Sequence, residues 1–195
     1  MRISLLKRLI ATALPSIVAL ASVPAFAADT FDIDAVHSSY IFRIKHLNVS
    51  YTYGRFNTSA GKFTIDAADP TKNAIEIEVK ADSIDTANPA RDKHLKGPDF
   101  FNVTEFPTMT FKSTAFKKKD GDKYEVTGDL TIHGVKKSVT TEVNLVGTGK
   151  GMKGETRAGW ETTLTIKRSD YGMNYMPEGI GDEVTLTIAI EGVKK

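Results

Sequence analysis

Polar and apolar residues alternate with a period of two over most of this chain, and this pattern limits the fold more than any other feature. In the segment 152–166 one face carries Ala158, Trp160, Thr162, Leu164 and Ile166, while the intervening positions are mostly charged. Because successive side chains of a β-strand point to opposite sides, such a segment is expected to form a strand with one buried face. The chain is therefore predicted to be all-β.

The same pattern predicts eight long strands, at 40–47, 53–65, 75–81, 108–116, 123–132, 136–146, 152–166 and 184–190, and a short one at 30–33. Turn signals separate them, among them His133-Gly134 and a glycine cluster at 147–154 that is typical of a flexible hairpin tip. The alternation slips by one residue beside Gly61, which predicts a bulge or a bend.

Short connections between long alternating strands favour an antiparallel sheet with one buried face. Closure into a barrel is preferred to a sandwich because long, twisted strands with free edges invite aggregation. Eight strands leave an interior wide enough for packed side chains or one slender ligand. An outer-membrane barrel would show the same alternation with its faces exchanged, but it would carry aromatic girdles, whereas the only tryptophan here is Trp160.

One long segment, 83–107, lacks the alternation. Asn88 is a good N-cap, Pro89 suits the first helical position, and Gly97-Pro98 supplies a left-handed stop, so a short helix is predicted at 89–96. Three phenylalanines follow among polar neighbours between residues 99 and 106. This composition indicates an ordered cover over one end of the barrel that helps to form the mouth of a cavity. The alternative is an ordinary packed crossover.

The first 27 residues have the pattern of a secretory signal peptide, with cleavage after Ala27. A basic head with Arg2, Lys7 and Arg8 precedes a short apolar run and the sequence Ala25-Phe26-Ala27. The run is too short for a membrane anchor, which needs about 20 apolar residues. Removing this segment leaves a domain of residues 28–195 with 23 basic and 24 acidic residues. A near-neutral charge argues against a nucleic-acid partner and against a binder of anionic membranes, since either would need a basic surplus concentrated on one face.

Motifs of catalysis and cofactor binding are missing from the sequence. It has no cysteine, no Gly-x-Ser-x-Gly elbow and no phosphate-binding glycine loop. His37, His46 and His94 lack the spacing of metal ligands, so no metal site is expected. His133 precedes Gly134 and is expected to be a turn residue. No cofactor and no enzymatic activity are predicted.

Motifs along almost the whole domain resemble the YceI-like family of periplasmic, lipocalin-like isoprenoid-binding proteins. They are Asp34-Ala-Val-His37 with Phe42, Lys45-His46, Gly54-Arg-Phe56, Ile84-Asp-Thr86, Arg91-Asp92-Lys-His94-Leu95, Asp99-Phe100-Phe101, Phe106-Pro107 with Met109, Phe111 and Ser113, Gly128-Asp-Leu-Thr-Ile-His133-Gly134, and Arg168-Ser-Asp170-Tyr171-Gly172. The resemblance implies an eight-stranded antiparallel barrel in the periplasm whose apolar pocket holds a long-chain isoprenoid or similar lipid without catalysis.

The candidate ligand-binding residues fall into two groups. Polar contacts at the mouth are assigned to Arg91, Asp92 and His94. The apolar lining is assigned to Tyr40, Phe42, Phe100, Phe111, Trp160 and Met173. Two other functions stay open: an enzyme acting on a lipid or isoprenoid, with His94 and Asp92 as an acid–base pair, and a structural domain with a filled core. The protein is not expected to be embedded in a membrane, and transient membrane contact and a homodimer also stay open.

Overall fold

A computed structural model describes residues 28–195, so the predicted signal peptide at 1–27 lies outside the described residues. The described chain is dominated by antiparallel strands, and no helix within it is long and apolar enough to cross a bilayer. The strands are β1 (Asp29–Ile33), β2 (Ser39–His46), β3 (Ser50–Phe56), β4 (Ser59–Ile65), β5 (Ala74–Lys80), β6 (Ile84–Asp85), β7 (Thr108–Lys118), β8 (Lys123–Ile132), β9 (Val135–Lys150), β10 (Thr156–Lys167) and β11 (Ile180–Lys194).

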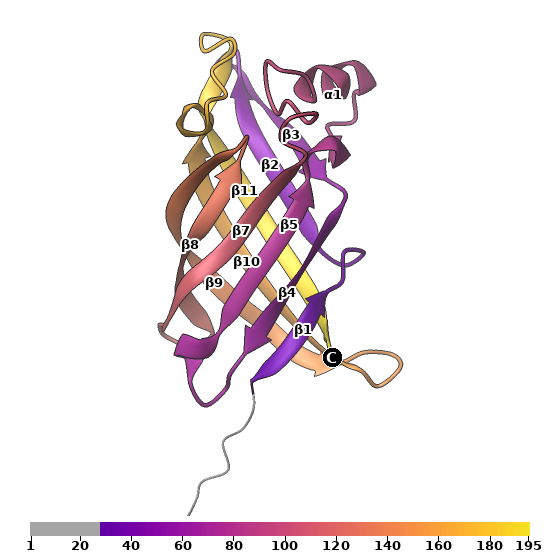
Figure 1. Cartoon of the computed structure of the whole chain (residues 1–195), viewed down its shortest axis with the longest axis vertical. Coiled ribbons are helices and arrows are strands. Elements are labelled where there is room, and N and C mark those ends of the chain that lie inside the picture. The colour runs from indigo at the N-terminus through magenta and orange to yellow at the C-terminus, as the bar shows by residue number, and fades with distance from the viewer. Residues whose placement is uncertain (1–27) are drawn as a thin grey trace, which may run out of the picture.

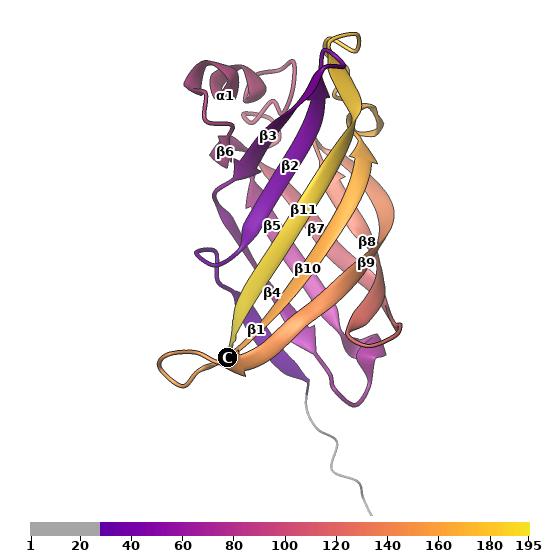
Figure 2. The same ribbon diagram turned by 180° about the vertical axis from the view of Figure 1, so that it is seen from behind.

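These segments form a closed antiparallel barrel, which confirms the predicted fold class (Figures 1 and 2). Strand β11 pairs with β2 along one half and with β1 along the other, where Phe31 lies opposite Lys194. Strand β4 pairs with β1, and β3 pairs with β2. The short strands β1 and β2 therefore occupy one strand position beside β11, and β3 and β4 occupy the next. The barrel therefore has eight strand positions and leaves few free backbone groups at an edge.

The predicted helix is present as α1 (Pro89–Leu95), capped by the side chain of Asn88, which accepts a hydrogen bond from the Arg91 N–H at 3.0 Å. It ends one residue earlier than expected, and the expected left-handed Gly97 is wrong, because Gly97 has no positive φ. The Gly97 N–H instead donates to the His94 carbonyl at 2.9 Å, which tightens the last turn. Short 3₁₀ turns lie at η1 (Pro70–Lys72), η2 (Ala81–Ser83) and η3 (Arg168–Tyr171).

Two local predictions about glycines are wrong. The bulge or bend predicted beside Gly61 is not found there, because the pairing of β4 with β5 runs through Gly61 without a register shift. The strand predicted at 53–65 is instead interrupted at residues 57–58, between β3 and β4. Gly61 has a φ of +152° and a Cβ there would collide with the Glu76 carbonyl oxygen, so it allows close strand approach instead of a bulge. The 147–154 cluster is not all hairpin tip, because β9 continues to Lys150 and only residues 151–155 form the turn.

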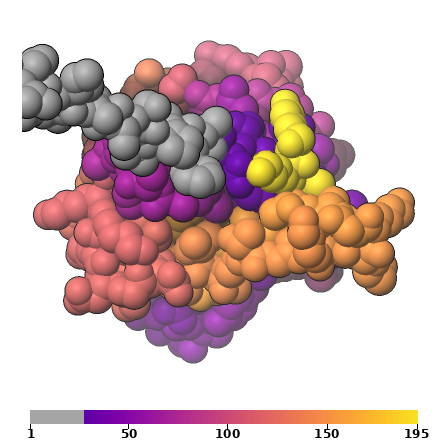
Figure 3. Space-filling model, turned by 90° about the horizontal axis from the view of Figure 1, so that it is seen from below, coloured from indigo at the N-terminus to yellow at the C-terminus, as the bar shows by residue number. Residues whose placement is uncertain are grey.

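A cluster of aromatic rings fills the barrel near the end where β1 begins and β11 finishes. Figure 3 views the molecule from this end, where the C-terminal residues lie beside the start of the described chain. Phe31 and Phe63 are stacked with ring centroids 5.0 Å apart, and Phe63 meets the edge of Trp160 at 6.5 Å. Trp160 also contacts Tyr124 at 5.2 Å and Phe116 at 6.0 Å. These five rings come from β1, β4, β7, β8 and β10, so they tie the closing strands together. We call this cluster the aromatic floor.

Truncating Phe63, which is fully buried in the aromatic floor, is expected to cost about 3–5 kcal/mol of the free energy of unfolding, because a phenyl ring is lost and a cavity remains. Urea unfolding of Phe63→Ala measures it, with an unchanged denaturant slope. The exposed Val146→Ala is the control and should stay within about 0.5 kcal/mol of the parent. Equal stability of both variants would contradict the assignment of the floor.

Candidate ligand-binding cavity

Above the aromatic floor the barrel interior holds a cavity of about 250 Å³. Its wall is made by the inward positions of the alternating strands and presents almost no polar atom. The aliphatic part of the wall includes Ile77, Val143, Leu164, Leu186 and Ile188. A cavity with such a wall favours hydrocarbon over water, because a buried water needs several polar partners.

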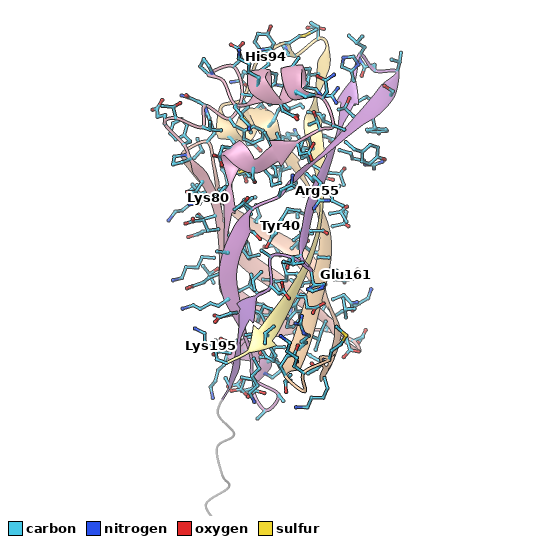
Figure 4. The ribbon with its side chains drawn as sticks, turned by 90° about the vertical axis from the view of Figure 1, so that its right-hand side faces the viewer. Tyr40, Arg55, Lys80, His94, Glu161 and Lys195 are labelled. Atoms are coloured by element: carbon cyan, nitrogen blue, oxygen red, sulfur yellow. The ribbon has the colours of Figure 1, made fainter. Side chains whose placement is uncertain are left out.

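The structure brings seven of the nine predicted site residues to this cavity. They are Tyr40, Phe42, Arg91, Phe100, Phe111, Trp160 and Met173. It does not bring Asp92 and His94 to the cavity wall. Figure 4 shows Tyr40 midway along the barrel and His94 at the end that carries α1. Contact of any of these residues with a ligand stays a prediction.

Two rings of the wall lie directly against glycines. Phe42 on β2 is paired with Gly54 on β3, and a Cβ at Gly54 would collide with the Phe42 ring. A Cβ at Gly128 would lie 2.5 Å from Phe111 Cζ. Because these glycines have no side chain, each ring has room to lie against the barrel wall. This arrangement explains why two phenylalanines point inward while the centre of the barrel stays open.

The segment after β6 covers the end of the barrel opposite the aromatic floor, as predicted (Figure 1). Its Leu95, Phe100 and Phe101 lie on the cavity wall, and Phe101 meets the ring of Phe56 on β3 at 5.5 Å. These contacts attach the cover to the barrel by apolar packing. The mouth of the cavity therefore lies at this end, beside Lys45 and His46, which are exposed and also line the cavity.

Hydrogen bonds to the buried Thr86 fix the position of α1. The Asp92 carboxylate accepts from the Thr86 N–H at 2.9 Å and from its hydroxyl at 2.5 Å. Arg91 donates from Nε to the Thr86 hydroxyl oxygen and from a terminal nitrogen to the Thr86 carbonyl, both at 2.7 Å. Asp92 therefore holds the cover in place, and Arg91 is anchored beside the cavity with other N–H groups unused.

His94 lies on the outside of the cover. Its Nε2 is 2.9 Å from an oxygen of Asp99, and its ring packs edge-on against Phe100 at 5.1 Å and Tyr175 at 5.4 Å. The acid–base pair of His94 and Asp92 considered above is not formed, since Asp92 bonds to Thr86. His94 instead joins the α1 segment to the loop that follows β10.

A buried arginine that the sequence reasoning did not assign to the site holds this second loop. Arg168, only 4% exposed, lines the cavity and donates to the carbonyls of Met173 at 2.7 Å, Ile180 at 2.9 Å and Gly181 at 3.0 Å. Burial lowers the pKa of Arg168, and the charge of Asp182 opposes this shift. In the sequence Arg168 directly follows an alternating strand. An arginine at such a position is usually exposed to solvent, so the sequence gives no sign that this one is buried.

Polar atoms deep in the barrel are turned away from the open space. The indole N–H of Trp160 and the hydroxyl of Tyr40 are buried without a hydrogen-bond partner. Burial raises the pKa of Tyr40, and the nearby Ser59 side chain opposes this shift without a well-aligned hydrogen bond. Neither atom is exposed to the cavity, so the deep end offers a ligand only carbon contacts. Polar groups of a ligand can be satisfied only near the mouth.

The three histidines weighed as metal ligands do not come together in the described part of the chain. The one group there with suitable atoms within 4.8 Å of one another is Asp34, His37 and Glu191. Arg157 donates to both carboxylates in this group, at 2.9 Å to Asp34. The Arg157 guanidinium already bonds to one oxygen of each carboxylate, which makes the group part of an ion-pair network that ties the turn between β1 and β2 to β10 and β11.

The fold and the cavity define a class: a closed, lipocalin-like antiparallel barrel with a carbon-lined interior that is filled at one end and covered at the other. The YceI-like domain family matches residues 31–192, and the chain belongs to this family. Protein YceI of Escherichia coli O157:H7 is 41% identical over 172 residues, which cover 88% of this chain and 90% of that protein.

Solved structures share the fold. BcnA of Burkholderia cenocepacia superposes with a TM-score of 0.75 at 24% identity, covering 82% of this chain and 98% of that one. A polyisoprenoid-binding domain from Saccharophagus degradans, implicated in plant cell wall breakdown, superposes with a TM-score of 0.67 at 17% identity, covering 85% and 98%. At these identities the likeness supports the barrel architecture.

Replacing Arg168 by Met is expected to cost about 3–5 kcal/mol of the free energy of unfolding, because three buried carbonyls lose charged donors. Hydrogen exchange should rise most at residues 171–181. The neighbouring exposed Lys167→Met is the matched control, with a change below about 0.5 kcal/mol. Unchanged exchange in this loop for Arg168→Met would show that the arginine does not hold it.

Asp34 is expected to stabilise the fold at neutral pH and to lose this effect in acid. Hydrogen bonds from His37 and then Arg157 lower the pKa of Asp34 to about 2, from 3.8. A carboxyl whose folded-state pKa is depressed stabilises above its unfolded pKa, and the gain is lost as pH falls from about 4 to 2. After solvent screening we expect about 1 kcal/mol.

Urea unfolding of the parent and Asp34→Asn at pH 7 and pH 2.5 measures this effect. The difference between the two proteins should be largest at pH 7 and should shrink at pH 2.5. A difference that is constant over this range would assign the loss to packing and not to the charge of Asp34.

Proposed function

We propose that this protein is a binding or carrier protein that holds the hydrocarbon chain of a long-chain isoprenoid or similar amphiphilic lipid inside its barrel, and that it does so without chemistry. The observation that carries this proposal is the cavity of about 250 Å³ whose wall presents almost only carbon. The solved relative whose name describes polyisoprenoid binding has the same barrel and supports the choice of ligand.

The size of the cavity bears on the length of chain it takes. An apolar cavity of about 150 Å³ binds benzene, so 250 Å³ takes roughly ten carbons by proportion, or about two isoprenyl units. At about 0.8 kcal/mol per carbon this burial yields roughly 8 kcal/mol, within the range of about 4–15 kcal/mol that association costs. A longer chain binds tightly only if the α1 cover moves or the chain extends through the mouth.

The distribution of polar groups supports one orientation for the ligand. The aromatic floor and the carbon wall suit the tail, while the mouth has Arg91 with unused N–H groups beside the exposed Lys45 and His46. A polar or anionic head group would therefore lie at the mouth, where Arg91 is the residue of choice for a planar or charged oxygen group.

The periplasm is the proposed location, and the support is the signal-peptide pattern of residues 1–27. The intact mass of the protein recovered from the periplasmic fraction should equal that of residues 28–195. Recovery of the protein only in the cytosol, at full length, would contradict both parts of this assignment.

Filling the cavity is expected to expel the lipid. Leu186 faces the cavity on β11, and Thr187, the next residue, faces solvent. Leu186→Trp should lower the amount of co-purifying long-chain lipid at least tenfold, whereas Thr187→Trp should leave it unchanged. Organic extraction and mass spectrometry measure the lipid, and thermal melting verifies that both variants are folded, because overpacking costs about 1–3 kcal/mol.

A parent protein that neither co-purifies with a long-chain lipid nor takes one up from a detergent-solubilised polyprenol would contradict the proposed function. Equal lipid in the two tryptophan variants would place the binding site outside the barrel.

A further inference from the structure

One part of the chain has an unusual charge distribution. No Asp or Glu occurs between Asp34 and Asp66, although the chain has 24 acidic residues in all. The same stretch contains four basic residues, Arg43, Lys45, Arg55 and Lys62. It forms β2, β3 and β4, and while Lys62 on β4 is paired with Glu76, the β2–β3 hairpin concentrates positive charge at one place of a barrel whose total charge is near zero.

The outward face of the β2–β3 hairpin combines these cations with tyrosines. Tyr51 and Tyr53 are 49% and 58% exposed, and their cross-strand partners are Lys45 and Arg43. The Arg43 guanidinium lies 4.6 Å from the centre of the Tyr51 ring, a cation–π contact. Arg55 follows on the same face of β3, close to Asp85 of β6, which offsets part of its charge.

The tip of this hairpin is apolar and exposed. Leu47 and Val49 are 51% and 81% exposed. Leu47 and Asn48 have φ values of +51° and +57°, and the Val49 N–H donates to the His46 carbonyl at 3.1 Å, so the tip is a tight turn with a defined shape. Exposed apolar side chains that gather at one place of a surface often mark a site of contact with a partner or a membrane.

A second loop continues the apolar surface at the same end. The Leu47 N–H donates to the Gly179 carbonyl at 2.7 Å, which joins the tip to the loop before β11 (Figures 1 and 2). This loop exposes Tyr175 and Met176 by 41% and 47%. Six of the ten large apolar side chains that are exposed in residues 28–195 thus gather beside the mouth of the cavity.

We infer that the β2–β3 hairpin and the loop around Met176 form a surface that docks on a lipid bilayer containing anionic lipid. Apolar tip residues would enter the acyl boundary, tyrosines suit the head-group layer, and Arg43, Lys45 and Arg55 would meet phosphates. Glu178, in the loop before β11, and Glu183, beside Val184 that pairs with Ile44, are exposed next to this surface and weaken the attraction locally. Docking would place the cavity mouth, which Lys45 and His46 line, against the membrane.

Vesicle flotation with residues 28–195, which contain the complete barrel and its core, tests the inference. The probes are vesicles of phosphatidylcholine alone and of phosphatidylcholine with phosphatidylglycerol at 7:3. The parent should bind the anionic vesicles, and 0.5 M salt should weaken this binding. A parent protein that floats with neither vesicle would overturn the inference.

Variants separate the two kinds of contact. Replacing Arg43, Lys45 and Arg55 by Gln should lower partitioning to anionic vesicles by roughly 100-fold, at about fivefold per cation near a charged surface. The matched control replaces Lys117, Lys150 and Lys153 by Gln at the other end of the barrel and should lower it less than threefold. An equal loss of vesicle binding in both triple variants would show that binding depends only on the net charge of the protein, and it would overturn the assignment to this surface.

A fluorescent reporter tests insertion of the tip. The only tryptophan, Trp160, is buried, so Val49→Trp adds a single exposed reporter. Its emission should shift to shorter wavelength on addition of anionic vesicles, while Met152→Trp, fully exposed at the opposite end, should not shift. A shift in both variants, or in neither, would overturn the docking orientation.

This inference goes beyond the proposed function and can fail separately from it. Vesicle binding is measured on protein freed of lipid, and lipid retention is measured without vesicles. Vesicle binding by a protein that retains no lipid would leave the docking surface standing and remove the proposed carrier role. Lipid retention by a protein that does not bind vesicles would support the carrier role and reject the docking surface.

Discussion

The packing of Trp160 against three other rings, one of which stacks on Phe31, is the contact on which the rest of the structure depends. These rings come from strands far apart in the sequence, and the segments that close the barrel, β1 and β4, contribute Phe31 and Phe63. Aromatic side chains bury large areas and are well suited to fill the end of a narrow barrel. Because the floor already fills one end, the remaining interior can stay hollow without exposing the hydrophobic core at both ends.

Polar chemistry and apolar contact are separated along the barrel axis. The floor and wall hold the interior by carbon contacts, while the segments at the mouth are also held by directed hydrogen bonds. Asp92 accepts from Thr86, Arg91 donates to Thr86, and Arg168 donates to the loop that follows β10. Both the α1 cover and this loop have many exposed residues. Such elements open at lower free-energy cost than core strands, which suits an entrance for a ligand.

The strand pattern could be predicted from the sequence because the period of two is local and continuous. The helix could be predicted because Asn88 and Pro89 act on their own neighbours. By contrast, Gly61 serves a contact with Glu76 on the next strand, and the roles of Gly54 and Gly128 become visible only with the rings of Phe42 and Phe111 in place. The role of Arg168 was missed because its partners are backbone carbonyls, which every residue carries. The role of Asp92 depends on Thr86, whose position relative to α1 is set by the fold.

The barrel above Trp160 encloses a carbon-lined cavity, and the proposed function requires that this cavity accept an apolar guest. Diffraction from a crystal of delipidated protein under xenon pressure tests it most directly, since xenon enters dry apolar cavities. We expect xenon density between Phe42, Phe111 and Leu186, with the wall side chains unmoved. An interior without xenon, closed by side chains that have collapsed onto one another, would contradict it.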